Sequence, residues 1–80
     1  MGYSVAITSQ LGDGFPDIIV GIKNINIMFE IKDENKPPSK RQLTPDEAKF
    51  ASLWRGQYSV IESLEQAIAY IKDYLKLFGK

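Results

Sequence analysis

The sequence predicts an α/β domain in which helices pack on a mixed β-sheet of about four strands. Two observations carry this prediction. The first half of the chain holds three short β-branched or apolar segments separated by turn residues, and the second half holds two segments of helical periodicity around a fourth apolar segment. The expected element order is β-β-β-α-β-α. A chain of 80 residues has room for a single domain, which would span residues 1–80.

Each of the three early segments has its own pattern. The first alternates and is rich in β-branched residues, and the second is a nearly continuous apolar run, typical of a strand covered on both faces. In the third, alternation places Ile27 and Phe29 on one face and Glu30 and Lys32 on the other. The strands are expected at residues 3–8, 17–22 and 25–32, with turns at residues 10–16 and 23–24.

The first helix has a clear expected start. A polar loop with a Pro-Pro pair, residues 33–42, leads to Thr44 as the N-cap. Pro45 suits the first helical position and Glu47 the third, which completes a capping box, and this is the role we favour for Glu47. Gly56 is placed to end the helix. Its expected buried stripe consists of Phe50, Leu53 and Trp54.

The last part of the chain predicts a strand and a helix. Residues 57–62 form the fourth strand, which should pair in parallel with the third because a helix connects them. Ser63 and Gln66 form a second capping box, and Gly79 closes the helix. Its apolar stripe is expected to comprise Leu64, Ala67, Ile68, Ile71, Leu75 and Phe78.

The composition restricts the possible chemistry. The absence of cysteine and histidine excludes disulfides, zinc fingers, a cysteine nucleophile and a histidine base. Carboxylate, lysine, hydroxyl and amide groups remain, so a bound metal would be a hard cation such as Mg²⁺ or Mn²⁺. Ten basic and ten acidic residues cancel, which argues against nonspecific coating of DNA. The sequence contains neither a membrane span nor a signal-peptide pattern, so we expect a soluble cytoplasmic protein with no membrane partner. We also expect it to use no nucleotide cofactor.

One constellation points to chemistry. Pro16-Asp17 stands at the entrance to the second strand, and the hairpin brings it beside Glu30 and Lys32 in the third. Two converging carboxylates repel each other unless a divalent cation lies between them. Such a cation activates water and polarises a phosphate oxygen, and Lys32 would orient the water or neutralise charge on phosphorus. These parts suit phosphodiester hydrolysis.

Each part also has a simpler explanation. A Glu-x-Lys triplet on an amphipathic strand is usually a solvated face with a weak ion pair, and a Pro-Asp dipeptide mostly starts a turn. The combination is more specific because order, spacing and strand context agree. In addition, Glu30 and Lys32 have apolar neighbours on both sides, where an unpaired charge would be costly.

These residues resemble a known family. G-F-P-D-I-I-V-G at residues 14–21 and F-E-I-K at residues 29–32 are similar to the motif pair of the PD-(D/E)XK nucleases, particularly the VRR-NUC and Holliday-junction-resolvase-like branch. In that branch a polar loop leads to L-(S/T)-P-x-Q and a helix, then a strand and a second helix. Here L-T-P-D-E-A-K-F at 43–50 and V-I-E-S-L-E-Q-A at 60–67 take those places. The resemblance covers residues 9 to about 70 and implies a restriction-endonuclease-like fold.

The resemblance also implies an activity. It suggests a Mg²⁺- or Mn²⁺-dependent endonuclease that hydrolyses DNA, often branched, flapped or junction DNA, often as a homodimer, and here from a phage or mobile element. Asp17 and Glu30 would be metal ligands together with the Ile31 carbonyl, and Lys32 would be the catalytic lysine.

The chain departs from the family pattern in two ways. Family members usually begin with a helix that supplies a further acidic residue, whereas this chain starts at the first strand, and one sheet face of a monomer is expected to be uncovered. Glu47 stands where the branch commonly has Gln, and Gln42 on the loop is the candidate to replace that amide.

Other residues are weaker candidates. Ser9 near the turn and Lys36, Lys40, Arg41 and Gln42 on the loop would contact DNA, although a solvated loop explains them equally well. Trp54 with Tyr58 would stack on a base, but helical spacing favours a core role for Trp54. The alternative to an enzyme is a non-catalytic module of nuclease fold that binds DNA or a protein partner.

Overall fold

A computed structural model describes residues 2–78, and within them the chain forms a four-stranded mixed sheet with two α-helices. The predicted order β-β-β-α-β-α is confirmed. No helix in the described part of the chain combines the length and the apolar character needed to cross a bilayer. The elements are β1 (Tyr3–Ile7), η1 (Ser9–Leu11, a 3₁₀ turn), β2 (Ile18–Ile22), β3 (Ile25–Ile31), η2 (Pro38–Lys40, a 3₁₀ turn), α1 (Pro45–Leu53), β4 (Gln57–Ile61) and α2 (Leu64–Phe78).

The strands lie in the sheet in chain order, β1-β2-β3-β4. β2 is antiparallel to both β1 and β3, and β3 is parallel to β4, as the β-α-β connection predicted. Lys23 and Asn24 form the turn between β2 and β3 with φ of 51° and 66°. Two consecutive positive φ values give a two-residue turn whose twist matches that of the flanking strands, so the predicted hairpin is confirmed.

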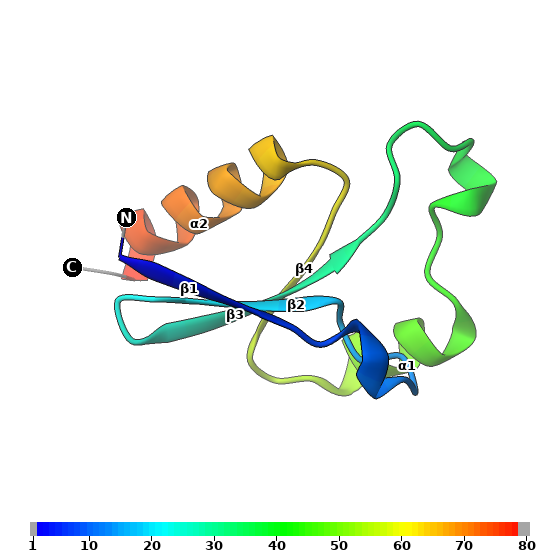
Figure 1. The fold of residues 1–80 in the computed structure, drawn as a ribbon, viewed down its shortest axis with the longest axis horizontal. Helices are drawn as coiled ribbons and strands as arrows, with labels where there is room; N and C mark the ends of the chain where they lie inside the picture. The colour runs from blue at the N-terminus through cyan, green and yellow to red at the C-terminus, as the bar shows by residue number, and fades with distance from the viewer. Residues whose placement is uncertain (1, 79–80) are drawn as a thin grey trace.

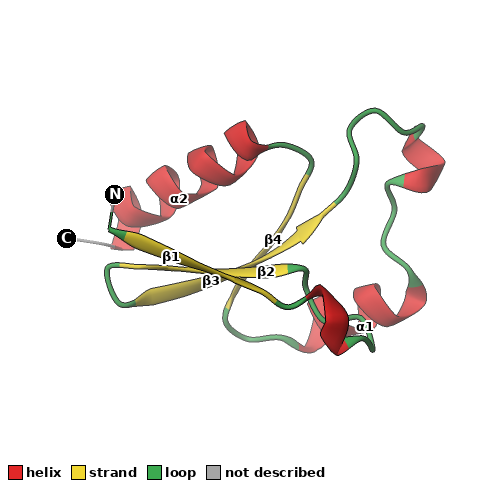
Figure 2. Cartoon of the chain, viewed as in Figure 1, coloured by secondary structure: helices red, strands yellow, loops and turns green. Residues whose placement is uncertain are grey.

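The two α-helices lie on opposite sides of the sheet (Figures 1 and 2). α2 covers the face that carries Phe29, whose ring meets the Tyr70 ring edge-on at a centroid distance of 5.6 Å. α1 approaches the other face near the end of β3, where Glu47 contacts Lys32. The alternation predicted for β3 therefore separates an apolar face, which packs in the core, from a face that carries the charged residues.

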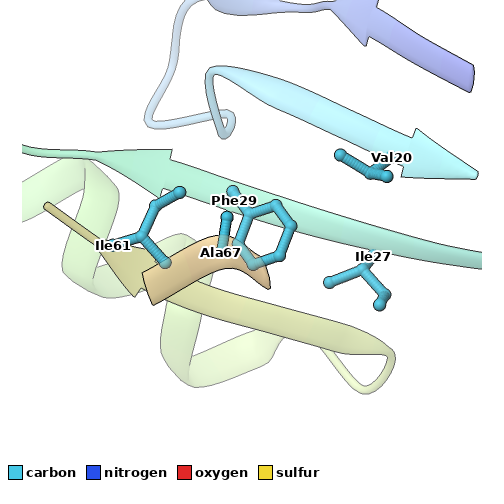
Figure 3. Close-up of a cluster of buried hydrophobic side chains, with 5 residues drawn as sticks. All are labelled: Val20, Ile27, Phe29, Ile61 and Ala67. Atoms are coloured by element: carbon cyan, nitrogen blue, oxygen red, sulfur yellow. The ribbon is translucent and has the colours of Figure 1, made fainter. Parts of the chain in front are cut away.

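The core is formed between α2 and the strands β2, β3 and β4 (Figure 3). Ile27 and Phe29 of β3 are completely buried in it, and Tyr70 and Ile71 of α2 pack against them. The central position of β3 explains this burial, since it has a strand on each side and a helix above. The buried members of the cluster are Val20, Ile27, Phe29, Ile61 and Ala67.

The apolar stripe predicted for α2 is correct only in part. Ala67 is buried and Ile71 packs on the core, whereas Leu64 and Ile68 are exposed. Tyr70 packs on the core instead, because the side of α2 that carries Ala67 and Tyr70 faces β3 and β4. The Phe78 side chain and Gly79 lie outside the described residues.

The second capping box forms with one altered bond. The Ser63 hydroxyl accepts a hydrogen bond from the Gln66 N–H, as expected for an N-cap. The Gln66 side chain, however, accepts a bond from the Glu62 N–H at 2.7 Å, one residue earlier than the predicted reciprocal partner. The start of α2 is thus secured by the predicted residues.

The prediction for α1 is right at its start and wrong for its packing. Thr44 and Glu47 form the complete capping box. No residue of α1 is buried, and Leu53 and Trp54 are 67% and 42% exposed, so the predicted buried stripe is wrong. The helix lies beside the turn before β2 and contacts it through Phe50, rather than lying flat on the sheet. It ends at Leu53, because Trp54 is already extended, and not at Gly56.

β1 leaves apolar side chains in solvent, as expected for a monomer. Tyr3, Val5 and Ile7 are exposed, although they lie on the same face of the sheet as the residues beneath α2. α2 packs on β3 and β4 and does not cover this edge of the sheet.

A matched pair of conservative substitutions tests this asymmetry. Ile27 is fully buried, whereas Ile7 is 80% exposed, and both lie in strands on the same face. We expect Ile27→Val to lower the free energy of unfolding by about 0.5–1.5 kcal/mol. Ile7→Val should change it by less than about 0.5 kcal/mol. Urea unfolding followed by circular dichroism measures both, and equal losses would show that β1 is covered in solution.

Candidate functional site

The turn before β2 is packed tightly on the first turn of α1. Gly14 adopts a φ of +79°, and a Cβ at this position would overlap the carbonyl oxygen of Asp46. The next residue, Phe15, meets the Phe50 ring edge-on at 5.1 Å. Glycine is required at this position by both the positive φ and the close approach. These contacts place the N-terminal turn of α1, and with it Glu47, beside the end of β3.

The N–H, the carbonyl and the carboxylate of Asp17 each form a hydrogen bond with a backbone group. Its N–H donates to the Phe29 carbonyl at 3.1 Å, and its own carbonyl accepts from the Thr8 N–H at 2.7 Å. Its carboxylate Oδ2 accepts from the Ile31 N–H at 2.8 Å. Pro16 before it is buried, and its carbonyl accepts from the Thr8 hydroxyl at 2.7 Å. The Asp17 carboxylate therefore lies at the end of β3.

Glu30 is a buried carboxyl group whose nearest positive charge, that of Lys32, is not within hydrogen-bond distance. It is only 3% exposed, and its Oε1 atom has no hydrogen-bond partner among residues 2–78. Its Oε2 atom lies 3.7 Å from the Lys32 Nζ. Burial, then the charge of Asp17 and the contact with Glu47, raise the pKa of Glu30 to about 8, and Lys32 opposes this only in part. At neutral pH Glu30 therefore tends to keep its proton.

Lys32 is bound more closely by Glu47 than by Glu30. The Lys32 Nζ donates to the Glu47 Oε1 at 2.7 Å, and the same oxygen accepts from the Thr44 N–H at 2.9 Å. Burial opposes ionisation of Lys32, but the hydrogen bond and charge of Glu47 and the other nearby carboxylates raise its pKa. Burial likewise opposes ionisation of Glu47, while the bonds from Lys32 and Thr44 lower its pKa. Glu47 thus caps α1 and orients Lys32 at once.

Tyr58 adds a polar group to the same face. It pairs with Met28 in the register of β3 and β4, which puts it on the face that carries Glu30. Its hydroxyl is buried and lacks a hydrogen-bond partner within the described part of the chain. Burial, then the charges of Glu30, Glu47 and Asp17, raise the pKa of Tyr58. The phenol therefore lies close to the carboxylates, a position that the parallel register with β3 could have indicated.

The predicted catalytic residues and Ile31 are brought together, whereas the residues predicted to contact DNA are not. Asp17, Glu30 and Lys32 converge at the end of β3. The predicted loop cations lie on a segment that extends away from the sheet (Figure 1), and Arg41 pairs there with Glu62 at 3.0 Å. The side chains without a contact to the converging residues are Ser9, Lys36, Lys40 and Gln42, all of them exposed.

The site offers oxygen donors in a partly buried setting. Glu30 and Glu47 contact the ammonium group of Lys32, and the charge of Asp17 also acts on it. No set of three or more carboxylates among residues 2–78 is arranged to hold one metal ion. Comparison with known proteins yields no matching family model, no similar curated protein and no similar solved structure.

The Gly14 contact can be tested against a nearby glycine. Gly12 has almost the same φ, +74°, but a Cβ there would meet nothing within 4 Å. Both Gly12→Ala and Gly14→Ala carry the conformational cost of positive φ, about 1 kcal/mol. Gly14→Ala also displaces α1, so we expect it to lower the free energy of unfolding by at least about 1 kcal/mol more. Denaturant unfolding of the two variants gives this difference, and equal values would contradict the close approach.

The raised pKa of Glu30 predicts how stability depends on pH. The folded state binds the Glu30 proton more tightly than the unfolded state, so this contribution is present below about pH 4.5 and is lost as pH rises toward 8. The Glu30→Gln variant has no carboxyl group at this position to lose a proton, so its stability does not fall in this pH range for this reason. We expect the stability of the variant relative to wild type to increase by more than about 1 kcal/mol between pH 5 and pH 8. Glu34→Gln in the exposed loop is the control, and parallel curves for wild type and Glu30→Gln would contradict the assignment.

Proposed function

We propose that this chain is a metal-dependent DNA endonuclease that hydrolyses phosphodiester bonds. The observation that carries the proposal is the convergence of Asp17, Glu30 and Lys32 in one partly buried site at the end of β3. A buried carboxyl with a raised pKa, next to a second carboxylate, is costly for the fold, and such arrangements concentrate at functional sites. The resemblance to the PD-(D/E)XK motif pair supports the same activity.

The residues present fit a hard cation. The Glu30 Oε1 has no hydrogen-bond partner among residues 2–78, and the Asp17 carboxylate is close enough for its charge to act on Glu30. An extended residue directs its N–H and its carbonyl to the same neighbouring strand, so the Ile31 carbonyl is expected on the side where its N–H meets Asp17. Asp17, Glu30 and the Ile31 carbonyl would hold Mg²⁺ or Mn²⁺. When bound, the cation would polarise a phosphate oxygen and lower the pKa of a water molecule.

The proposed contribution of Lys32 to catalysis follows from the two carboxyl groups that fix the position of its ammonium group. Its side chain is 13% exposed and its ammonium group lies between Glu30 and Glu47, so its position is set before any substrate arrives. A charge that needs no reorganisation is effective against the negative charge that develops on a phosphate in the transition state. In this mechanism Lys32 faces the phosphate, and Glu47 is a positioning residue that keeps the ammonium group protonated and oriented.

The proposed substrate is branched, flapped or junction DNA, and the proposed active form is a homodimer. The substrate class comes from the resemblance. The homodimer is supported by β1, an edge strand without charged residues or proline that exposes Tyr3, Val5 and Ile7. Unprotected edges with apolar side chains are typical sites of strand pairing, so a second copy would cover both the edge and the apolar row.

A non-catalytic module that binds DNA or a protein partner is the second candidate. One observation favours it: Lys32 is already paired with Glu47 at 2.7 Å, so its charge is compensated within the chain before any phosphate binds. The grouping of carboxylates found in residues 2–78 also falls short of three ligands to one metal ion. Activity with a divalent cation separates the two candidates.

Substitutions at the site test the enzyme proposal. With Mn²⁺ or Mg²⁺ and a branched DNA substrate, we expect cleavage by the wild type and none detectable for Asp17→Ala. Lys32→Ala should lower the cleavage rate about 10²–10³-fold, because a positioned charge at the phosphate is lost. Gel analysis of end-labelled DNA measures both.

Lys72 provides the matched control, since it is an exposed lysine on α2, on the opposite side of the sheet. Lys72→Ala should cleave at the wild-type rate. Absence of cleavage with either metal, combined with unchanged DNA binding by Asp17→Ala, would refute the enzyme and leave the binding module. Circular dichroism of each variant establishes that the fold is retained.

A further inference from the structure

Trp54 lies at the end of α1 as an exposed aromatic platform. Its indole stacks on the Phe50 ring with a centroid distance of 5.2 Å and an interplanar angle of 15°. Despite this contact, Trp54 remains 42% exposed. Stacking covers one ring face, so the platform retains a surface that can meet a flat ligand.

The platform is ordered before any ligand binds. The backbone N–H of Trp54 donates to the Phe50 carbonyl at 3.0 Å, which fixes the backbone at this residue. Gly56 leaves room for the indole, since a Cβ there would lie only 2.8 Å from the Trp54 Nε1. Phe50 is itself held by the Phe15 ring at 5.1 Å. A restrained aromatic ring loses little conformational freedom on binding, so stacking on it is favourable.

Phe50 connects the platform to the candidate site. Its ring centroid lies 6.1 Å from that of Tyr58, whose hydroxyl lies close to the site carboxylates. Glu47, the partner of Lys32, belongs to the same helix as Phe50 and precedes Trp54 by about 10 Å along the helix axis. Arg55, the next residue after Trp54, is exposed and available to a phosphate. The platform is therefore within reach of a base close to a phosphate bound at the site.

We propose that Trp54, stacked on Phe50, binds an unpaired nucleobase of the substrate. The proposal rests on the proposed function, because the base belongs to the DNA cleaved at Asp17 and Glu30. A base inside a duplex has both faces covered by its neighbours, so only an unpaired or extruded base offers a face to the indole. Stacking of this kind is tolerant of base identity, since every base has a π-face. The platform therefore selects DNA with unpaired nucleotides rather than a sequence.

Trp54 is the only tryptophan of the chain, so its fluorescence reports on this position alone. We would titrate the protein in EDTA, where no metal-dependent cleavage occurs, with a short thymidine oligonucleotide and with an abasic oligonucleotide of the same length. We expect the thymidine oligonucleotide to quench Trp54 and to bind about 5- to 150-fold more tightly than the abasic one. Equal affinity for the two oligonucleotides would overturn the proposal.

Three variants give the same test without relying on fluorescence, with binding measured by anisotropy of labelled DNA. Trp54→Ala should reduce affinity for the thymidine oligonucleotide to that for the abasic one, whereas Trp54→Phe keeps a ring and should retain most of it. Gly56→Ala displaces the indole without deleting it and should weaken binding. Leu53→Ala, the exposed neighbour on α1, is the matched control and should bind like wild type. Wild-type affinity of both Trp54→Ala and Gly56→Ala would overturn the proposal.

The outcome is independent of the test of catalysis. If DNA is cleaved but Trp54→Ala cleaves unpaired and fully paired substrates in the wild-type ratio, the base-stacking proposal fails and the nuclease stands. If the thymidine oligonucleotide quenches Trp54 but no metal supports cleavage, the nuclease fails and the stacking site stands. Quenching that depends on protein concentration without DNA would assign the platform to self-association and overturn the proposal.

Discussion

The carboxyl group of Glu30 is buried on the central strand of the sheet, and much of the surrounding structure compensates for it. β3 has a strand on each side, and Glu30 is only 3% exposed because Asp17, Lys32 and Glu47 lie around its carboxyl group on the face opposite α2. Burial of a carboxylate is unfavourable unless it is paired or protonated. Lys32 pairs with Glu30 in part at 3.7 Å, and because the pKa of Glu30 is raised to about 8 the group favours its neutral form at neutral pH. The same environment leaves the Glu30 Oε1 without a hydrogen-bond partner among residues 2–78.

The position of α1 depends on the ion pair between Glu47 and Lys32 as well as on the close contact at Gly14. The helix has no buried residue, so an apolar stripe does not hold it in place. It is held at its N-terminal turn, where Gly14 lets the chain before β2 come into contact with Asp46 and where Glu47 reaches Lys32. The acceptor that caps the helix is also the counter-ion of the lysine. The Glu47 carboxylate therefore both caps the helix and sets the charge of the site. Phe50 is the apolar side chain of α1 that packs on the turn before β2, and Trp54 at the end of the helix stays largely exposed.

α2 leaves the β1 edge of its face of the sheet uncovered. Its buried row reaches β3 and β4, and the apolar residues of β1 stay in solvent. A domain of this size buries a limited fraction of its surface, so an uncovered apolar edge reduces an already small margin of stability. A partner that adds to β1 would extend the sheet and complete the core at the same time, without altering the site on the opposite face.

The sequence alone determined the elements and the grouping of the charged residues. Alternation in β3 placed Glu30 and Lys32 opposite Phe29, the hairpin brought Asp17 next to them, and the Thr44–Glu47 capping box started α1 where it was expected, because each of these depends on local patterns. Tertiary structure decided the rest. Whether Phe50, Leu53 and Trp54 would be buried depended on where α1 lies relative to the sheet, which helical periodicity does not specify. The contact of Glu47 with Lys32, the burial of Tyr58 beside the carboxylates and the raised pKa of Glu30 likewise arise only when segments distant in the chain are packed together, since burial and charge proximity are properties of three-dimensional packing rather than of spacing.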